Sequence, residues 1–271
     1  MPSDHSLFSS SEIEQFQRDG FVVIRGLAAP SLCERMKSLT ERHLAIPVEP
    51  VEYEADTHYT GAPPSREAPG GRAVRRLLQS FARDPLFRDW AMSELLAGRL
   101  RQLLGPRIDL SQAHHNCVMT KDPAFSSATD WHQDIRYWSF QRPDLVSAWL
   151  ALGPERIDNG CLLLVPGSHR LELRRDQYDE ALVFRTDLDE NRAILARQVP
   201  AELDTGDVLF FHARLLHAAG SNRTRLTKFA VVFTFHASDN PPLPGTRSAS
   251  LPDISLEPPP DRFTSASAAS P

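Results

Sequence analysis

From Ile108 onward the chain is a series of short apolar runs that turn residues separate, and this texture limits the possible folds more than any other feature. The runs are rich in Val, Leu, Phe and Trp, and most of them are too short for a typical helix. Short strands at such spacing are typical of an antiparallel sandwich or barrel. The predicted strands are residues 113–120, 131–138, 146–152, 161–165, 193–199, 208–211 and 226–236.

The first hundred residues predict helices around one strand. Ser11 and Glu14 have the spacing of a capping box, and the helix that they begin is expected to end at Gly20. Residues 21–24, Phe-Val-Val-Ile, form a predicted buried strand. Apolar residues repeat at helical spacing after Pro30, which predicts a second helix there.

A further helical region begins at Asp84 and Pro85, an N-cap followed by proline at the first helical position, and runs to Gly105. We expect these helices to pack on the outside of a sheet. Residues 49–71 are rich in Pro, Gly and charge and have no periodicity, which indicates a long mobile loop that could act as a lid.

The organisation predicted from these patterns is one domain over residues 1–236. It has a helical part, residues 1–107, and a β-rich core, residues 108–236. Residues 237–271 contain PPLP and PPP with many Ser and Ala, so this tail is expected to wrap the surface or to be disordered.

The composition restricts the partners. With a formal net charge of -5, the chain offers no basic field for nucleic acid or for an anionic membrane surface, so a small molecule is the expected partner. The sequence contains neither a signal peptide nor an apolar run long enough to span a bilayer, which predicts a cytoplasmic protein of open oligomeric state. Cys33, Cys117 and Cys161 are far apart and predict buried thiols, not a disulfide framework or a zinc knuckle.

Three residues have the pattern of a metal site. His132 and Asp134 are two positions apart in a strand-like segment, so both side chains can face the same ion. His217 follows 83 residues later, just after an apolar strand. Two imidazoles and one carboxylate leave three positions of an octahedron open, which suits Fe(II), whereas zinc usually prefers a closed tetrahedral set. An H-x-D triplet is weak evidence alone, and a zinc hydrolase is a remote alternative.

The surrounding strings resemble the phytanoyl-CoA dioxygenase family. The resemblance extends over residues 21–236 and is most specific in the block from Asn159 to Arg170. It implies a mainly β fold with flanking helices around a double-stranded β-helix, a jelly-roll of the cupin type. It also implies Fe(II) held by His132, Asp134 and His217. The strings are WHQD from Trp131, VSAWLAL from Val146, DNGCLLLVPGSHR from Asp158 and GDVLFFH from Gly206.

The resemblance further implies a 2-oxoglutarate-dependent dioxygenase that uses dioxygen to hydroxylate a small molecule, such as a secondary metabolite or an amino-acid-like compound. No catalytic residue is expected beyond the metal ligands. Desaturation, epimerisation or cyclisation at the same iron site is an alternative outcome. A non-catalytic binding protein on the same fold is a rival from another class.

Two positions depart from the family pattern. Lys228 stands where relatives place an arginine that binds the far carboxylate of 2-oxoglutarate, and a lysine loses the bidentate geometry of arginine. Arg225 is the rival for this role. Ala219 replaces a residue that often carries a hydroxyl group. These departures support the alternative that the chain is a non-catalytic binding protein on the same fold. Asn116 and Trp149 are further candidates for the co-substrate pocket, although Trp149 could equally be plain core.

Other residues are candidates for substrate contact or for structural roles. Arg136, Tyr137 and Trp138 directly follow the triplet and are predicted to contact the substrate. His114 and His115 are expected on the preceding strand, where neighbours face opposite ways, so that one of them could line the cavity. His169 is expected to stabilise a turn, and His212 to be a half-buried strand residue.

Overall fold

A computed structural model describes residues 7–57 and 59–256. Its larger sheet has the strand order β1-β10-β7-β12-β5-β3-β2, with β4 added beside β12 and β13 beside β4. All of its pairings are antiparallel. The strands are β1 (Phe21–Ile24), β2 (Val51–Tyr53), β3 (Val74–Leu78), β4 (Ile108–Leu110), β5 (Cys117–Lys121), β7 (Leu145–Ala151), β10 (Val208–His212), β12 (Lys228–Ala237) and β13 (Ile254–Leu256).

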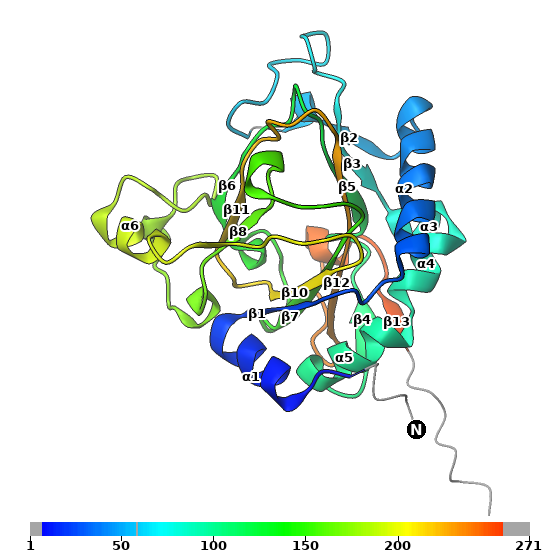
Figure 1. Ribbon diagram of the computed structural model, residues 1–271. Helices are drawn as coiled ribbons and strands as arrows, with labels where there is room; N and C mark the ends of the chain where they lie inside the picture. Colours follow the sequence, from blue (N-terminus) through cyan, green and yellow to red (C-terminus); the bar gives the residue numbers. More distant parts are fainter. Residues whose placement is uncertain (1–6, 58, 257–271) are drawn as a thin grey trace, which may run out of the picture.

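The smaller sheet has the order β6-β11-β8-β9, and its strands β6 and β11 carry His132 and His217. Figure 1 shows it on one side of the molecule, with the larger sheet opposite. Two facing antiparallel sheets with flanking helices agree with the predicted jelly-roll. The strands are β6 (Thr129–His132), β8 (Leu162–Leu164), β9 (Val199–Pro200) and β11 (His217–Ala219).

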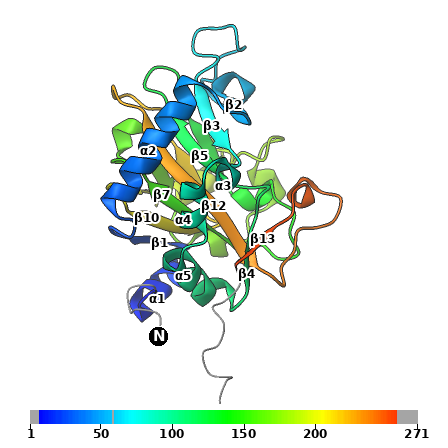
Figure 2. The same cartoon turned by 90° about the vertical axis from the view of Figure 1, so that its right-hand side faces the viewer.

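Most helices cover the outer face of the larger sheet, as Figure 2 shows for α2, α3, α4 and α5. Asp84 caps α4 by accepting a hydrogen bond from the backbone N–H of Leu86, and Pro85 occupies its first position, as predicted. No helix in the described part of the chain is long and apolar enough to cross a membrane. The helices are α1 (Ser10–Asp19), α2 (Pro30–Ala45), α3 (Ser80–Arg83), α4 (Pro85–Ala91), α5 (Glu94–Leu104) and α6 (Asp189–Leu195).

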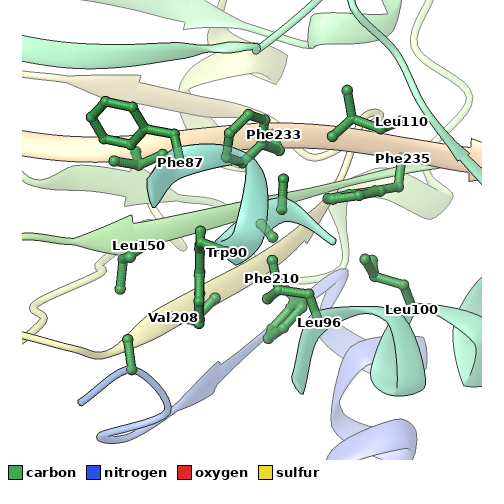
Figure 3. Packing of buried hydrophobic residues seen from close by; sticks show 14 of the residues in the cluster. Phe87, Trp90, Leu96, Leu100, Leu110, Leu150, Val208, Phe210, Phe233 and Phe235 are labelled. Carbon is green, nitrogen blue, oxygen red and sulfur yellow. The ribbon is translucent and has the colours of Figure 1, made fainter. Parts of the chain in front are cut away.

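The main hydrophobic core lies between these helices and the outer face of the larger sheet (Figure 3). Phe87 of α4 and Leu100 of α5 pack above Phe210, Phe233 and Phe235 of the sheet, and all five are inaccessible to solvent. A fully buried side chain of this size contributes about 1.5–3 kcal/mol. The helices therefore hold the sheet rigid, and the opposite face of the sheet is left for a second, smaller cluster and the site.

Several predicted boundaries were wrong. Residues 193–199 were predicted as a strand, but the segment belongs to helix α6 up to Leu195. Its apolar residues alternate too irregularly to distinguish the period of a helix from that of a strand. The capping box of α1 is formed by Ser9 and Glu12, two residues earlier than the predicted pair Ser11 and Glu14. The long segment 49–71 is partly ordered, because β2 pairs with β3.

Candidate metal centre

Strand pairing brings the two histidines of the predicted metal site together. His132 ends β6, His217 begins β11, and the two residues are direct partners in the antiparallel register. Their ring centroids lie 4.2 Å apart. The 84 residues between them form other strands, turns and loops, so the site depends on the topology of the sheet.

Asp134 reaches the same point from a different conformation than predicted. The strand ends at His132, and Asp134 begins the 3-10 turn Asp134–Arg136. Its Oδ1 atom lies 3.5 Å from His132 Nε2 and 3.8 Å from His217 Nε2. The expected i, i+2 strand geometry is wrong for Asp134, but the turn still aims its carboxylate at both imidazoles.

Gln133, between the two ligands, points the other way. Its side chain is buried, donates to the carbonyl of Arg214 and accepts a hydrogen bond of 2.7 Å from Tyr178 Oη. It therefore anchors the end of β6 while His132 and Asp134 face the site.

The donor set fits a metal ion. His132 Nδ1 lies 2.8 Å from the carbonyl of Asp130, and His217 Nδ1 lies 3.0 Å from that of Leu215. These bonds place the proton on Nδ1 and leave each Nε2 lone pair directed at the site. The other carboxylate oxygen, Asp134 Oδ2, is buried without a hydrogen-bond partner among the described residues. The three ligand atoms lie within 4.8 Å of one another.

Burial and neighbouring charges set the protonation of these groups. Burial, together with the nearby His132, lowers the pKa of His217 to about 4, so the imidazole is neutral and free to bind a metal at neutral pH. Burial alone would raise the pKa of Asp134. The imidazoles of His115, His217 and His132 outweigh it and hold that pKa below its usual range, so the carboxylate is ionised.

An inner cavity runs from the metal centre between the two sheets. His132 and His217 line one part of it, and the side chains of Lys121 and Lys228 line another. Half of its other lining residues are apolar. The other lining residues are Arg75, Arg76, His115, Met119, Thr120, Thr129, Trp149, Leu162, Phe211 and Ala219.

Two of the predicted co-substrate residues lie in this inner cavity. Lys228 is buried and forms an ion pair of 2.8 Å with Glu155, which is itself fully buried. Trp149 donates from Nε1 to the other oxygen of Glu155 at 2.7 Å. Ala219 lines the cavity too, while Arg225 is exposed and lies outside its lining.

An outer cavity opens on the other side of the metal centre, and His132 and His115 line both cavities. Asn116, predicted for the co-substrate, lines this outer cavity instead of the inner one. Its Oδ1 accepts from the backbone N–H of Phe81 at 2.9 Å, while its Nδ2 is buried without a partner among the described residues.

The predicted substrate residues divide between two places. Tyr137 and Trp138 line the outer cavity. Arg136 is not among the lining residues. Its guanidinium donates to Gln133 and to the carbonyl of Leu173 and stacks 4.5 Å from the ring centroid of Tyr178.

His114 and His115 precede β5 and do not lie on a strand, so the expectation that they face opposite ways was wrong. His115 has a positive φ of 39°, and both histidines line the outer cavity. His115 Nε2 lies 3.6 Å from Asp134 Oδ1, and His114 Nε2 lies 2.7 Å from Ser248 Oγ. His169 lies in a 3-10 turn and His212 is a partly buried strand residue, both as predicted.

The comparison with known families covers most of the chain. The profile of the family described as Phytanoyl-CoA dioxygenase (PhyH) matches residues 16–230. Peroxisomal phytanoyl-CoA dioxygenase of Homo sapiens is 28% identical over 248 residues, which is 87% of this chain and 70% of the human protein. Ectoine dioxygenase of Streptomyces coelicolor is 27% identical over 249 residues, which is 86% of this chain and 79% of that protein.

Solved structures share the fold. EctD from S. alaskensis with bound Fe superimposes with a TM-score of 0.72 at 21% identity, over 90% of this chain and 81% of that one. The epimerase SnoN in complex with Fe3+, alpha ketoglutarate and nogalamycin RO gives a TM-score of 0.68 at 20% identity, over 93% and 96%.

The predicted jelly-roll fold is confirmed by these structures. The predicted class of enzyme, a non-haem iron dioxygenase dependent on 2-oxoglutarate, is confirmed through the family and agrees with a donor set of His132, Asp134 and His217. With four fifths of its length matched by one profile, the chain belongs to the phytanoyl-CoA dioxygenase family.

Proposed function

We propose that this chain hydroxylates a small-molecule substrate, with His132, Asp134 and His217 as the ligands of Fe(II). The observation that carries the proposal is the convergence of the three ligand atoms within 4.8 Å at the junction of two separate cavities. One cavity can then receive 2-oxoglutarate and the other the substrate. When bound, the iron supplies the oxidising chemistry with dioxygen.

The protein's own contribution is to bind, orient and exclude water. The backbone carbonyls of Asp130 and Leu215 fix the two imidazole rings. The sheets on both sides of the inner cavity are apolar apart from a few charged groups, which limits water near the metal centre. Phe211 and Trp149 belong to this apolar wall.

We assign the inner cavity to 2-oxoglutarate, with Lys228 and Trp149 on its lining. Arg225 is a weaker candidate because its side chain is exposed. The outer cavity is assigned to the substrate, with Tyr137 and Trp138 as contacts. Asn116 belongs to the same side, since its buried, unpartnered amide N–H₂ suits a substrate that presents a hydrogen-bond acceptor. Three free, buried cysteines are compatible with a reducing compartment such as the cytoplasm.

The test is anaerobic reconstitution followed by turnover. Purified protein with Fe(II) and 2-oxoglutarate should develop a visible metal-to-ligand charge-transfer band, and exposure to dioxygen should yield succinate. Asp134→Ala should do neither. Absence of the band and of succinate in the wild-type protein would support the binding-protein alternative.

The outcome of the reaction is read from product mass. A product that gains one oxygen atom supports hydroxylation. A product that loses two hydrogen atoms would indicate desaturation or cyclisation instead of hydroxylation. A product of unchanged mass with an inverted stereocentre would indicate epimerisation.

A further inference from the structure

Lysine is rare in this chain, and its distribution is unusual. The sequence contains three lysines against 27 arginines. Two of the three, Lys121 on β5 and Lys228 on β12, are direct partners in the antiparallel register, are buried, and line the inner cavity. Two ammonium groups side by side in a buried wall repel each other and lose hydration, so an anion is needed nearby.

Glu155 supplies that anion for Lys228 alone. The Lys228 ammonium and the Glu155 carboxylate lie 2.8 Å apart, with exposed side-chain fractions of 4% and 0%. The second oxygen of Glu155 is held by Trp149 Nε1, and its backbone pairs with Leu203 in both directions. Glu155 is therefore fixed at Lys228.

The two arginines of the inner cavity are also neutralised. Arg75 pairs with the buried Glu54 at 3.2 Å, and Arg76 pairs with Glu52 at 2.6 Å. Lys121 differs from them, because within residues 7–57 and 59–256 its ammonium donates to the carbonyl of Ser127 at 3.0 Å and no carboxylate lies within ion-pair distance. Four cations therefore line the inner cavity, and three carboxylates outside its lining pair with all of them except Lys121. The cations are Arg75, Arg76, Lys121 and Lys228, and the carboxylates are Glu52, Glu54 and Glu155.

We infer that Lys121 binds the far carboxylate of 2-oxoglutarate and provides the charge that Lys228, committed to Glu155, does not. This inference rests on the proposed use of 2-oxoglutarate. The cavity that contains Lys121 also contains His132 and His217, so a 2-oxo diacid bound at the metal by its keto-acid end directs its other carboxylate into the same space. One surplus positive charge matches one carboxylate.

The surroundings of Lys121 hold its side chain in place. A Cβ atom at Gly160 would come within 2.9 Å of Lys121 Cδ, so the loop at Gly160 packs closely against the aliphatic part of the lysine side chain. Ser127, whose carbonyl accepts from the ammonium, is fixed by its own hydroxyl group, which bonds to Glu54 at 2.6 Å. Burial, with Arg75 and Lys228 nearby, lowers the pKa of Lys121 to about 7, which shows how poorly the protein alone compensates this charge.

The experiment compares two ligands that differ in the far carboxylate. Binding of 2-oxoglutarate and of pyruvate is measured by anaerobic calorimetry on protein loaded with Fe(II), for wild type, Lys121→Met and Lys37→Met. Lys37 is half-buried on α2 and is the remaining lysine of the chain. We expect Lys121→Met to lose about 10- to 100-fold in affinity for 2-oxoglutarate, the effect of one hydrogen-bonded charge, with no change for pyruvate. Lys37→Met should match wild type.

The outcomes separate the inference from the proposed function. If Lys121→Met keeps the wild-type preference for 2-oxoglutarate over pyruvate, the inference is wrong and the proposed function stands. If the wild type binds neither 2-oxoglutarate nor pyruvate, the proposed function itself is wrong.

A second measurement covers the case in which Lys121→Met does not fold. Limited acetylation of the iron-loaded wild type is followed by peptide mass spectrometry. 2-Oxoglutarate should protect Lys121 while pyruvate does not, and Lys37 serves as the internal standard. Equal acetylation of Lys121 with either ligand would overturn the inference.

Discussion

His132 and His217 are opposite each other on neighbouring antiparallel strands, and their Nε2 atoms both face Oδ1 of a single carboxylate. The backbone hydrogen bonds of β6 and β11 therefore determine the separation of two proposed metal ligands. A shift of one residue in this register would turn one imidazole to the other face of the sheet. The contribution of each proposed ligand can be tested separately.

Asp134→Ala should abolish turnover and weaken Fe(II) binding by more than about 100-fold, since even the loss of an outer partner of a ligand costs about 10- to 100-fold. The carboxylate is the only anionic ligand of the proposed set. Metal affinity by competition with a chromogenic chelator is the measurement. Asp187→Ala, which removes an exposed carboxylate paired with Arg185, is the control and should bind iron like wild type. Equal affinities in the two variants would contradict the proposed ligand set.

Metal should stabilise the folded chain, because the three ligands come together only when β6 pairs with β11. Mn(II), a redox-stable substitute, at 100 times its dissociation constant should raise the free energy of unfolding by about 2.7 kcal/mol. Thermal melts with and without Mn(II) measure this, and a chelator should reverse it. His217→Ala should show no such gain, and a gain equal to that of wild type would place the ion elsewhere.

Gly160→Ala should destabilise the protein more than Gly245→Ala does. Both glycines have a φ of +76°, so the backbone strain of an alanine is the same. At Gly160 the new Cβ would also meet the carbonyl oxygen of Gly220 at 2.4 Å, whereas at Gly245 it meets nothing within 4 Å. We expect a loss of about 1–2 kcal/mol for Gly245→Ala and at least about 1 kcal/mol more for Gly160→Ala by urea unfolding. Equal losses would show that the loop at Gly160 can move away.

The pH dependence of stability should report the buried ammonium of Lys121. Its folded pKa is about 7, below the ordinary value of 10.5, so between these values the unfolded chain holds a proton that the folded chain lacks. Stability then rises with pH across this window, by up to about 1.4 kcal/mol per pH unit. Without 2-oxoglutarate, wild type should gain stability relative to Lys121→Met between pH 7 and 9, because the other titrating groups are common to both. Parallel unfolding curves at the two pH values would contradict this.

The candidate metal-binding residues and the fold class could be predicted from the sequence, because both rest on short local signals. His132 and Asp134 are neighbours in the chain, and the block from Asn159 to Arg170 is long enough to identify a family. The register that joins His132 to His217 could not be predicted, since it depends on hydrogen bonds between strands that are 85 residues apart.

The charge balance of the inner cavity was harder to predict. Glu155 lies in a loop, and nothing in the local sequence indicates that it is fully buried beside Lys228. One feature of the sequence points to Lys121, namely the scarcity of lysine in an arginine-rich chain. A strand assignment places His114 and His115 on opposite faces, so it could not predict that both line the outer cavity.

The segment after β12 changes how the chain can be divided. Ser248 accepts from the backbone N–H of Ser139 and bonds His114, while β13 extends the sheet through β4. Arg247, Ser250 and Leu251 line the outer cavity, yet all of them lie beyond residue 230, where the family profile ends. We therefore expect that exchanging this terminal segment alters substrate preference, while the strands that carry the proposed iron ligands keep their sequence.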